Sequence, residues 1–396
     1  MDNKTLVIGG GIGGLATALA LLRRDHDVEV YERVPDLQEI GAGLTLSPNG
    51  TRLLFSLGLE SKLRELGVLS RDRELRLWNT GQAWPLQNQG STSEARYGAP
   101  YLTMHRGDLH TMLLDAVKKE KSDAVRTGYR CVDVSSSSSG VVAKFDNGMT
   151  ATGQILVGAD GIHSAVREQL HGTPKPQYVG NIFWRGMVPI EMVPERERGV
   201  ASSWISPQGN VTMYPVRSGK LFNFVGTVKK PSWHTNSWTE KGTIEECLAD
   251  FEGWHPNIRS IISHIETPYK WGSYLYETEP SWSKGRITLL GDSCHAMPPS
   301  LGQGANMAIE DAVVLVRCVE KYGPDWELAL GWYENLRQPR TKKVVDQSWA
   351  QSKRRHNEAL ANPDTAVEYI SQHWAPSKVG DWYDWIYEYD ATSVHV

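Results

Sequence analysis

Within the first 32 residues, the hydrophobic positions form three short blocks separated by glycines and charges. Lys4–Ile8 is an apolar, β-branched run that ends in glycines, which predicts a buried strand. Leu15–Leu22 consists of small and apolar residues and predicts a helix, and Val28–Tyr31 predicts a second strand that ends at Glu32. This order of strand, glycine turn, helix and strand predicts a βαβ unit at the start of the chain.

The glycine turn has the spacing G-x-G-x-x-G at Gly9, Gly11 and Gly14, with a further glycine at Gly13. In such a turn the first glycine permits a tight bend, the second lets backbone approach a pyrophosphate, and the third lets helix pack on strand. The helix N-terminus supplies unpaired N–H groups for the phosphates. Glu32, 18 residues after Gly14, is placed to accept hydrogen bonds from ribose hydroxyls. The sequence therefore predicts a dinucleotide-binding site.

Two later stretches have helical spacing. Apolar residues at positions 109, 112, 113, 116 and 117 predict an amphipathic helix that starts at Arg106. A cation at a helix start is disfavoured by the helix dipole, so either a phosphate or ribityl partner or plain solvation accounts for Arg106. Trp326–Ala361 also alternates charged and apolar residues at helical spacing, with a kink or break expected at Gln338–Arg340.

Between residues 173 and 280 the helical period fades. Short apolar runs such as Val211–Val216 and Leu221–Val228 are separated by Ser-Gly, which predicts a β-meander. The last thirty residues are rich in Trp and Tyr, and such a tail either closes over the body or forms a dimer contact.

Two further glycine–acid turns follow strand-like runs. One contains Asp160-Gly161 and is followed by Arg167, and the other contains Gly291-Asp292. The second turn continues through Pro298-Pro299 into a helix expected from about Gly304.

Composition narrows the possible functions. The chain has 396 residues, of which 40% are hydrophobic and 22% charged, and a net charge of −4, which argues against a nucleic-acid groove. No apolar run approaches the roughly 18 residues of a membrane-spanning helix, and no signal peptide is expected. The four cysteines are scattered and the histidines have no metal-ligand spacing, so we expect no metal site and a cytoplasmic location.

The three motifs, in this order and spacing, resemble the single-component FAD-dependent aromatic hydroxylases typified by p-hydroxybenzoate hydroxylase. Within that family the likeness is closest to salicylate hydroxylase, 3-hydroxybenzoate 6-hydroxylase and 6-hydroxynicotinate 3-monooxygenase. The resemblance covers nearly the whole chain and includes His105–Leu109, Trp184–Met187 and Asp384–Asp390.

This resemblance implies an α/β fold with interleaved domains. A Rossmann-like FAD-binding domain would comprise residues 1–75, 99–172 and 279–340. An α+β substrate domain built on a β-sheet would comprise residues 76–98 and 173–278, and a C-terminal helix with the aromatic tail would comprise residues 341–396.

The resemblance also implies how the motifs hold FAD. Asp160 and Arg167 would serve the FAD pyrophosphate and the nicotinamide cofactor, and an Asp that caps a helix beside an Arg is the alternative. Asp292 would hold ribityl hydroxyls unless it is an ordinary helix-entry Asp. Arg33 would lie over the adenine or be solvated. The expected cofactor residues are Gly9, Gly11, Gly13, Gly14, Glu32, Arg33, Arg106, Asp160, Arg167, Gly291, Asp292, Gly304, Ala305 and Asn306.

Three catalytic residues are implied in the same way. Tyr214 aligns with a tyrosine that meets the substrate's ring hydroxyl in hydroxybenzoate hydroxylases, where sharing the proton makes the ring more nucleophilic. Core packing is the alternative for this residue. Pro299 would lie beside the flavin ring, and His295 would belong to the flavin loop.

The expected substrate residues are Thr45, Trp184, Asn210 and Tyr214. Two of them depart from the family, since related branches carry His where this chain has Thr45 and Asn210. No arginine in the sequence is clearly placed to hold a carboxylate.

The implied function is an aromatic-ring monooxygenase of aromatic catabolism. NADH or NADPH would reduce FAD, O2 would add to give a flavin C4a-hydroperoxide, and a hydroxybenzoate, salicylate or hydroxypyridine carboxylate would be hydroxylated. The alternative is a non-oxygenating FAD oxidase, reductase or FAD-binding protein. We expect no nucleic-acid or membrane partner, and a monomer or homodimer.

Overall fold

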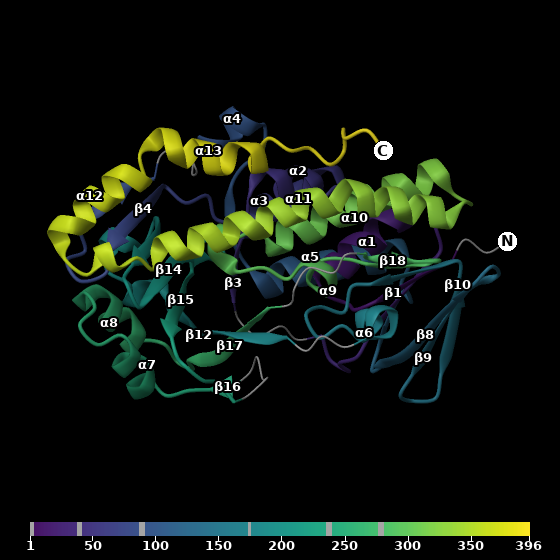
Figure 1. Ribbon diagram of the computed structural model, residues 1–396, viewed down its shortest axis with the longest axis horizontal. Coiled ribbons are helices and arrows are strands. Elements are labelled where there is room, and N and C mark those ends of the chain that lie inside the picture. The colour runs from purple at the N-terminus through teal and green to yellow at the C-terminus, as the bar shows by residue number, and fades with distance from the viewer. Residues whose placement is uncertain (1–3, 38–41, 87–91, 173–175, 235–239, 276–280) are drawn as a thin grey trace.

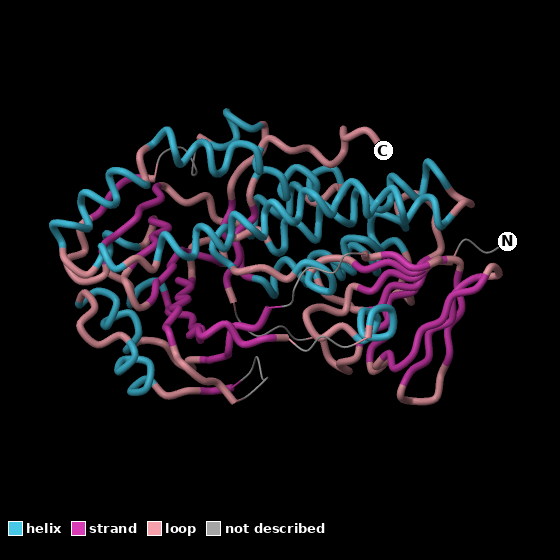
Figure 2. The backbone as a smooth tube through the Cα atoms, in the orientation of Figure 1, coloured by secondary structure: helices cyan, strands magenta, loops and turns pink. Residues whose placement is uncertain are grey.

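The computed structural model describes residues 4–37, 42–86, 92–172, 176–234, 240–275 and 281–396. The described chain forms two large β-sheets, and one long helix, α11 (Trp326–Arg355), runs along the long axis of the molecule past both (Figure 1). Figure 2 shows the strands of the two sheets as separate groups. The predicted mixed α/β fold class is confirmed.

The first sheet has six strands and is mostly parallel. Its order is β18 (Ser283–Lys284), β19 (Ile287–Leu289), β11 (Ile155–Gly158), β1 (Thr5–Ile8), β2 (Val28–Glu32) and β7 (Val125–Thr127). β1 lies between β2 and β11, so that Val7 pairs with both Val30 and Val157. All four residues of β1 are buried, as expected for a strand covered on both faces.

Helices cover this sheet. The helix after the glycine turn, α1 (Ile12–Leu22), packs against α5 (Arg106–Glu120) and α10 (Gly304–Tyr322), and all three begin where the sequence predicts a helix or within three residues of it. The other helices here are α2 (Pro48–Ser56), α3 (Glu60–Leu66), α4 (Ser93–Tyr97), α6 (Ala165–His171), α9 (Asp292–His295) and the 3-10 helix η3 (Pro299–Leu301).

Two small sheets accompany the six-stranded one. They are the pair β3 (Gly43–Leu46) and β6 (Leu102–His105), and the three-stranded sheet of β8 (Cys131–Ser137), β9 (Gly140–Phe145) and β10 (Thr150–Gly153).

The second large sheet has eight strands and contains the predicted meander. Its order is β16 (Glu240–Lys241), β17 (Tyr269–Leu275), β12 (Gln177–Pro189), β15 (Leu221–Lys229), β14 (Gly209–Val216), β13 (Val200–Ile205), β4 (Asp72–Leu77) and β5 (Ala83–Pro85). The short 3-10 helices η1 (Ile190–Met192) and η2 (Glu195–Glu197) connect β12 to β13. The exact limits of the proposed domains stay a prediction.

Each strand of this sheet alternates between two faces, because successive side chains point to opposite sides. One face carries Trp184, Trp204, Met213 and Phe224, which pack with α7 (Ile244–Asp250) and α8 (Pro256–Ser263) in one apolar cluster. The other face is turned toward the loops of the six-stranded sheet and forms part of a cavity described below.

The C-terminal helices differ from expectation at one point. A break at Gln338–Arg340 is wrong, because α11 continues as one helix through Pro339. The alternative of a kink there stays a prediction. Proline removes an intrahelical hydrogen bond, but Arg337 and Arg340 on either side of it make ion pairs with a buried carboxylate and hold both halves of the helix. The chain then continues through η4 (Glu358–Leu360), α12 (Pro363–His373) and α13 (Pro376–Tyr387).

The aromatic tail packs against the body of the same chain. Tyr383, Ile386 and Tyr387 of α13 share an apolar cluster with Leu75 and Leu77 of β4. Across the described ranges, no helix combines the length and the apolar character that a membrane crossing requires.

Candidate functional site

The glycine turn between β1 and α1 has two closed positions and one open position. A Cβ on Gly9, whose φ is +109°, would lie 2.3 Å from the Ala159 carbonyl oxygen, and one on Gly14 would lie 2.0 Å from the Gly9 oxygen. A Cβ on Gly11 would meet no described atom within 4 Å. Gly9 and Gly14 therefore serve the fold, whereas Gly11 leaves the N-terminus of α1 open to a ligand.

Glu32 ends β2 and supports the same turn. Its Oε2 accepts a hydrogen bond from the Gly10 N–H at 2.8 Å, and its Oε1 accepts one from Val34 N–H at 3.0 Å. Arg33, the neighbouring residue, is exposed. Arg106 begins α5, lines the cavity and donates its backbone N–H to the Ala42 oxygen at 2.7 Å.

The second motif differs from the expectation. Asp160 caps α6, since its Oδ2 accepts the N–H groups of Ala165 at 2.7 Å and Val166 at 3.2 Å. Arg167 is buried and donates to the carbonyl oxygens of Ile162 at 2.8 Å and Ser293 at 2.9 Å. Burial raises the pKa of Asp160. In this structure Asp160 holds the start of α6, Arg167 joins the second motif to the third, and neither side chain lines the cavity. Their expected cofactor contacts stay a prediction.

The third motif presents Asp292 to the cavity. Asp292 is exposed and lines the cavity, whereas Gly291 is buried and donates its N–H to Asp311 Oδ2 at 3.1 Å. At the start of α10, Gly304 and Ala305 line the cavity, and no side chain among the described residues caps this helix N-terminus. Its unpaired N–H groups are therefore available to an acceptor.

Asn306 corrects another expectation. Its side chain is fully buried, with Nδ2 donating to the oxygens of Thr45 at 3.1 Å and Gly302 at 2.9 Å, while Oδ1 accepts the Ser47 N–H at 3.1 Å. Asn306 thus joins β3 to the loop before α10, and its side chain is not directed into the cavity.

His295 does not reach the cavity either. Its Nε2 lies 2.6 Å from Asp311 Oδ2, and both side chains are 0% exposed. Asp311 also accepts from Arg337 Nε at 2.7 Å, and Arg337 Nη1 donates to Glu310 at 2.7 Å. The expected catalytic role of His295 was wrong, because its imidazole is directed into this buried ion-pair network behind the flavin loop.

The sequence analysis missed this network. Arg340 completes it by donating to both carboxylate oxygens of Glu310, at 2.6 and 2.7 Å. Burial alone would raise the pKa values of Glu310 and Asp311, but the neighbouring positive charges outweigh it and hold both values below their ordinary range. The network fixes Gly291 through Asp311 and so positions the turn that carries Asp292.

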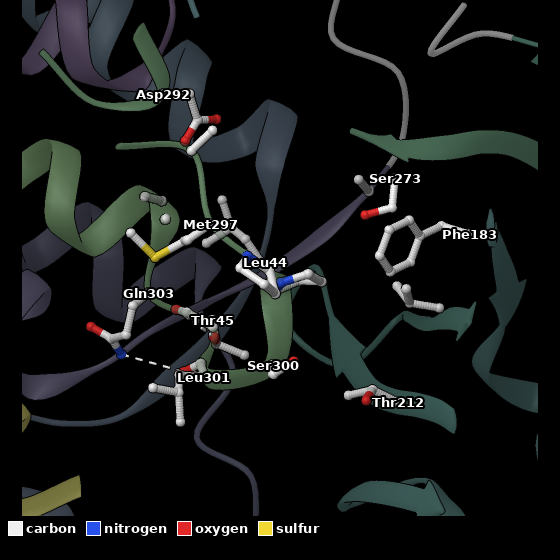
Figure 3. Close-up of a pocket in the computed structure, with 18 of the residues that line it drawn as sticks. Leu44, Thr45, Phe183, Thr212, Ser273, Asp292, Met297, Ser300, Leu301 and Gln303 are labelled. Atoms are coloured by element: carbon white, nitrogen blue, oxygen red, sulfur yellow. Dashed lines mark hydrogen bonds between the residues drawn. The ribbon is translucent and has the colours of Figure 1, made fainter. Parts of the chain in front are cut away.

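A cavity of about 480 Å³ lies between the cofactor loops and the open face of the eight-stranded sheet. Figure 3 shows Asp292, Met297 and Gln303 on one side, Phe183, Thr212 and Ser273 on the other, and Leu44 and Thr45 between them. Pro299 lines the same cavity, as expected for a proline beside the flavin ring.

The sheet side of the cavity consists of side chains that share one face. Strand pairing aligns them in the rows Arg185–Val225–Thr212–Ser203, Phe183–Thr227–Asn210 and Tyr214–Ala201–Arg73. Trp184 lies on the opposite face, where its Nε1 donates to Asp250 at 2.8 Å, so its expected substrate contact was wrong. Period-two alternation along β12 was the signal that would have chosen Phe183 and Arg185 instead.

Tyr214 is buried and lines the cavity. Burial and the nearby Tyr101 raise the pKa of Tyr214, so that its phenol stays protonated at neutral pH. Thr45 donates to the Gly302 oxygen at 3.3 Å, and Asn210 Oδ1 lies 2.8 Å from His356 Nε2. Hence Tyr214, Thr45 and Asn210 meet in one cavity, and the C-terminal end of α11 supplies a histidine there that the sequence analysis missed.

Besides Arg106, three arginines line the cavity, although no arginine seemed placed for a carboxylate in the sequence. Arg185 lies over the Trp271 ring, with its Cζ 4.4 Å from the ring centroid. Arg73 and Arg355 come from β4 and from the last residue of α11. In the described part of the chain, no group of three or more His, Cys, Asp or Glu residues could hold a metal ion.

These features fit a dinucleotide cofactor whose ring end reaches the sheet. The open backbone at Gly11 and the uncapped N-terminus of α10 offer a pyrophosphate site and N–H donors along one continuous cavity. Glu32, at the end of β2, does not line this cavity and contacts the same glycine turn through the Gly10 N–H. The cavity then continues over the sheet face that bears Tyr214.

Comparisons with known proteins agree with this geometry. A family profile described as FAD binding domain matches residues 2–348. The chain is 35% identical over 393 residues to 3-amino-4-hydroxybenzoate 2-monooxygenase of Streptomyces platensis, covering 99% of this chain and 97% of that protein. It is 34% identical to 6-hydroxynicotinate 3-monooxygenase of Pseudomonas fluorescens, covering 87% of this chain and 91% of that protein.

Among solved structures, Klebsiella pneumoniae HpxO complexed with FAD and uric acid superposes with a TM-score of 0.82 at 27% identity. The match covers 96% of each chain.

Proposed function

This chain belongs to the FAD-dependent aromatic hydroxylases, and on that premise we propose that it hydroxylates a hydroxyaromatic carboxylate, with NADH or NADPH as electron donor and O2 as oxidant. One observation carries the proposal: a single cavity joins the dinucleotide-binding loops to a sheet face that bears a neutral tyrosine and two arginines, Arg73 and Arg185, and Arg355 of α11 lines the same cavity. The relatives are named as acting on an aminohydroxybenzoate and a hydroxynicotinate, both aromatic carboxylates.

The chain's own residues would bind and orient the cofactor. The α1 N-terminus at Gly11 would face the pyrophosphate, Glu32 a ribose, and Asp292 the ribityl chain. The N-terminus of α10 at Gly304 would direct N–H groups and a positive dipole end at the flavin and favour negative charge there. The redox chemistry, namely electron uptake from NAD(P)H and transfer of one oxygen atom of O2, is supplied by FAD when it is bound.

Tyr214 would act on the substrate. Because its pKa is raised, the phenol donates a hydrogen bond at neutral pH and holds the substrate's ring hydroxyl as the proton of that hydroxyl is shared or lost. A ring with phenolate character is more electron-rich and reacts more readily with an electrophilic oxygen. The apolar side chains of Leu44, Phe183 and Met297 around this part of the cavity help to exclude water from the reaction.

The proposed setting follows from the same features. The four cysteines are free and buried, which is consistent with the reducing cytoplasm we propose. A monomer or homodimer remains our prediction for the oligomeric state.

NAD(P)H consumption tests the function directly. We would add a panel of hydroxybenzoates, aminohydroxybenzoates and hydroxynicotinates to the holoenzyme and score NAD(P)H oxidation together with product mass. A hydroxylase consumes NAD(P)H faster with its substrate and yields a product heavier by one oxygen atom. A yellow protein whose NAD(P)H oxidation no aromatic acid alters would instead support the alternative of a non-oxygenating FAD protein.

Asp292→Ala tests the cofactor site separately. Loss of a hydrogen bond to a charged group corresponds to about a 10- to 100-fold weaker FAD affinity. Asp346→Ala on the exposed side of α11 is the control, since Asp346 pairs only with Lys342 at the surface among the described residues. Full flavin occupancy of Asp292→Ala at limiting FAD would remove Asp292 from the site.

A further inference from the structure

Two arginines in the cavity have no acidic partner. Arg73 and Arg355 both line it, and among the described residues no carboxylate lies within 4 Å of either guanidinium. Arg355 is only 9% exposed, and its Nε is a buried donor without a hydrogen-bond partner. The same is true of Nη1 of the half-buried Arg73.

The surroundings of the pair are aromatic and neutral. Arg73 Cζ lies 4.7 Å from the centroid of the Tyr101 ring. Burial lowers the pKa of Arg355, the tyrosines nearby oppose this effect, and the positive charge of Arg73 adds to it. His356 contributes no charge at neutral pH, because burial and the charge of Arg355 lower its pKa to about 4.

Two other buried arginines are matched by acids, whereas the buried Arg167 donates to carbonyl oxygens. Arg76 pairs with Glu197 at 2.5 Å and with Glu74 at 2.6 Å, and Arg337 pairs with Glu310 and Asp311. Burial of an unpaired charge is costly, and neither a cation–π contact nor the dipole at the end of α11 compensates for two of them. The Arg73–Arg355 pair is therefore incomplete without an anion.

Strand register places this pair relative to Tyr214. Arg73 on β4 pairs with Ala201 on β13, one residue beyond Ser202, which pairs with Met213 on β14. Arg73 and Tyr214 thus occupy the same face two strands apart, about 10 Å between backbones. Ala201, between them, is buried and packs with Tyr214 in a small apolar cluster.

We propose that Arg73 and Arg355 bind the carboxylate of the aromatic substrate, while Tyr214 holds its ring hydroxyl. This inference rests on the proposed function and specifies its substrate class as an anionic ring, held at the end of the cavity formed by β4, α11 and α13. Arg185 lies on the same face of the sheet but on β12, four strands along from Arg73 on β4, and it stacks on Trp271, so we assign the carboxylate to the other two arginines. Tyr383 of the C-terminal helix α13 completes the wall beside Arg355.

The test uses two probes that differ by the carboxylate alone: 3-amino-4-hydroxybenzoate and 2-aminophenol. Their Kd values are measured by the change in flavin absorbance of the oxidised holoenzyme, without turnover. In Arg73→Gln and Arg355→Gln, we expect the Kd of the benzoate to rise about 10- to 100-fold and that of 2-aminophenol to change less than about twofold. Lys353→Gln, which removes an exposed charge from the same helical turn, is the control and leaves both values unchanged.

Arg355→Lys guards against a folding artefact. Lysine keeps the positive charge but lacks the planar guanidinium that makes two parallel hydrogen bonds, so Arg355→Lys should bind the benzoate more tightly than Arg355→Gln does. A misfolded variant would not regain this affinity. Equal loss for both probes, or no loss for either, would overturn the inference.

Failure of the two proposals is distinguishable. A wild-type enzyme that hydroxylates 2-aminophenol but does not bind the benzoate keeps the proposed ring hydroxylation, and it refutes both the carboxylate site and the carboxylate as part of the substrate. An enzyme that binds the benzoate through both arginines yet forms no hydroxylated product keeps the carboxylate site and refutes the proposed function. Binding of neither probe contradicts both.

Discussion

Replacement of Arg337 by Met is expected to destabilise the protein strongly. Arg337 donates to Glu310 and Asp311 at 2.7 Å each, and all three side chains are 0% exposed. Removing one partner from a buried ion pair costs about 3–5 kcal/mol, because the remaining charges stay desolvated. An unfolding entropy of about 2.1 cal/mol/K per residue corresponds to about 1.2 °C per kcal/mol for 396 residues, so the thermal midpoint is expected to fall by about 4–6 °C.

The chain offers a matched control at the surface. Arg64 also pairs with two carboxylates, those of Glu60 at 2.9 Å and Glu94 at 2.5 Å, but all three side chains are at least 42% exposed. Exposed pairs are worth about 0–1 kcal/mol, so Arg64→Met should lower the midpoint by no more than about 2 °C.

Thermal unfolding of the holoenzyme, followed together with flavin release, measures both effects. Because Asp311 holds the Gly291 N–H, flavin release should shift with unfolding in Arg337→Met. The pKa values of Glu310 and Asp311 are lowered in the folded state, so this stabilisation is present above their ordinary values of 4.5 and 3.8 and is lost as the pH falls. The gap between wild type and Arg337→Met should therefore narrow in acid. Equal shifts for the buried and the exposed variant would refute the reasoning.

Three further outcomes are expected. Gly14→Ala should lower folded yield and flavin content together, since its Cβ would lie 2.0 Å from the Gly9 oxygen. Gly11→Ala should keep the thermal midpoint of the apoprotein but weaken FAD binding, because its Cβ would meet no described atom within 4 Å. Equal behaviour of the two variants would contradict the assignment of Gly14 to the fold and of Gly11 to the ligand. Tyr214→Phe should slow product formation while FAD occupancy stays full, and an unchanged product rate would remove Tyr214 from the mechanism. Folding lowers the pKa of His356 from 6.5 to about 4, so between these pH values the unfolded chain binds more protons than the folded chain. The free energy of unfolding of the wild type should therefore fall by up to about 3 kcal/mol as the pH drops through this range. His356→Gln should flatten this pH dependence, measured as thermal midpoints from pH 7 to pH 4.

The parts of the site that the sequence predicts are local in the chain. The turn at Gly9–Gly14, the acid at Glu32 and the turn at Gly291-Asp292 each lie at the end of a strand, where spacing alone determines the geometry. These elements lie where the pattern places them, because short-range backbone constraints dominate there.

The parts that were missed depend on contacts between distant segments. Arg73 and Arg355 are separated by most of the chain and meet only because α11 crosses the eight-stranded sheet. The motifs around His295 and Asn306 were located correctly in the sequence, but the directions of the two side chains were not predictable from it. Asp311 determines the direction of the His295 side chain, and the Thr45 backbone oxygen determines that of Asn306. Sequence spacing locates a loop without revealing which way its side chains turn.

The course of α11 and α13 has a consequence for how this enzyme can change. The shared family profile ends at residue 348, and the next turn of α11 contributes Trp349, Ser352 and Arg355 to the cavity, followed by Tyr383 from α13. The cofactor loops and the sheet face of the cavity are encoded within residues 2–348, whereas one end of the cavity, which includes Arg355, is encoded beyond them. Given the proposed carboxylate site, mutations in this last stretch are expected to alter which ring is accepted while the glycine turns that hold the cofactor stay unchanged.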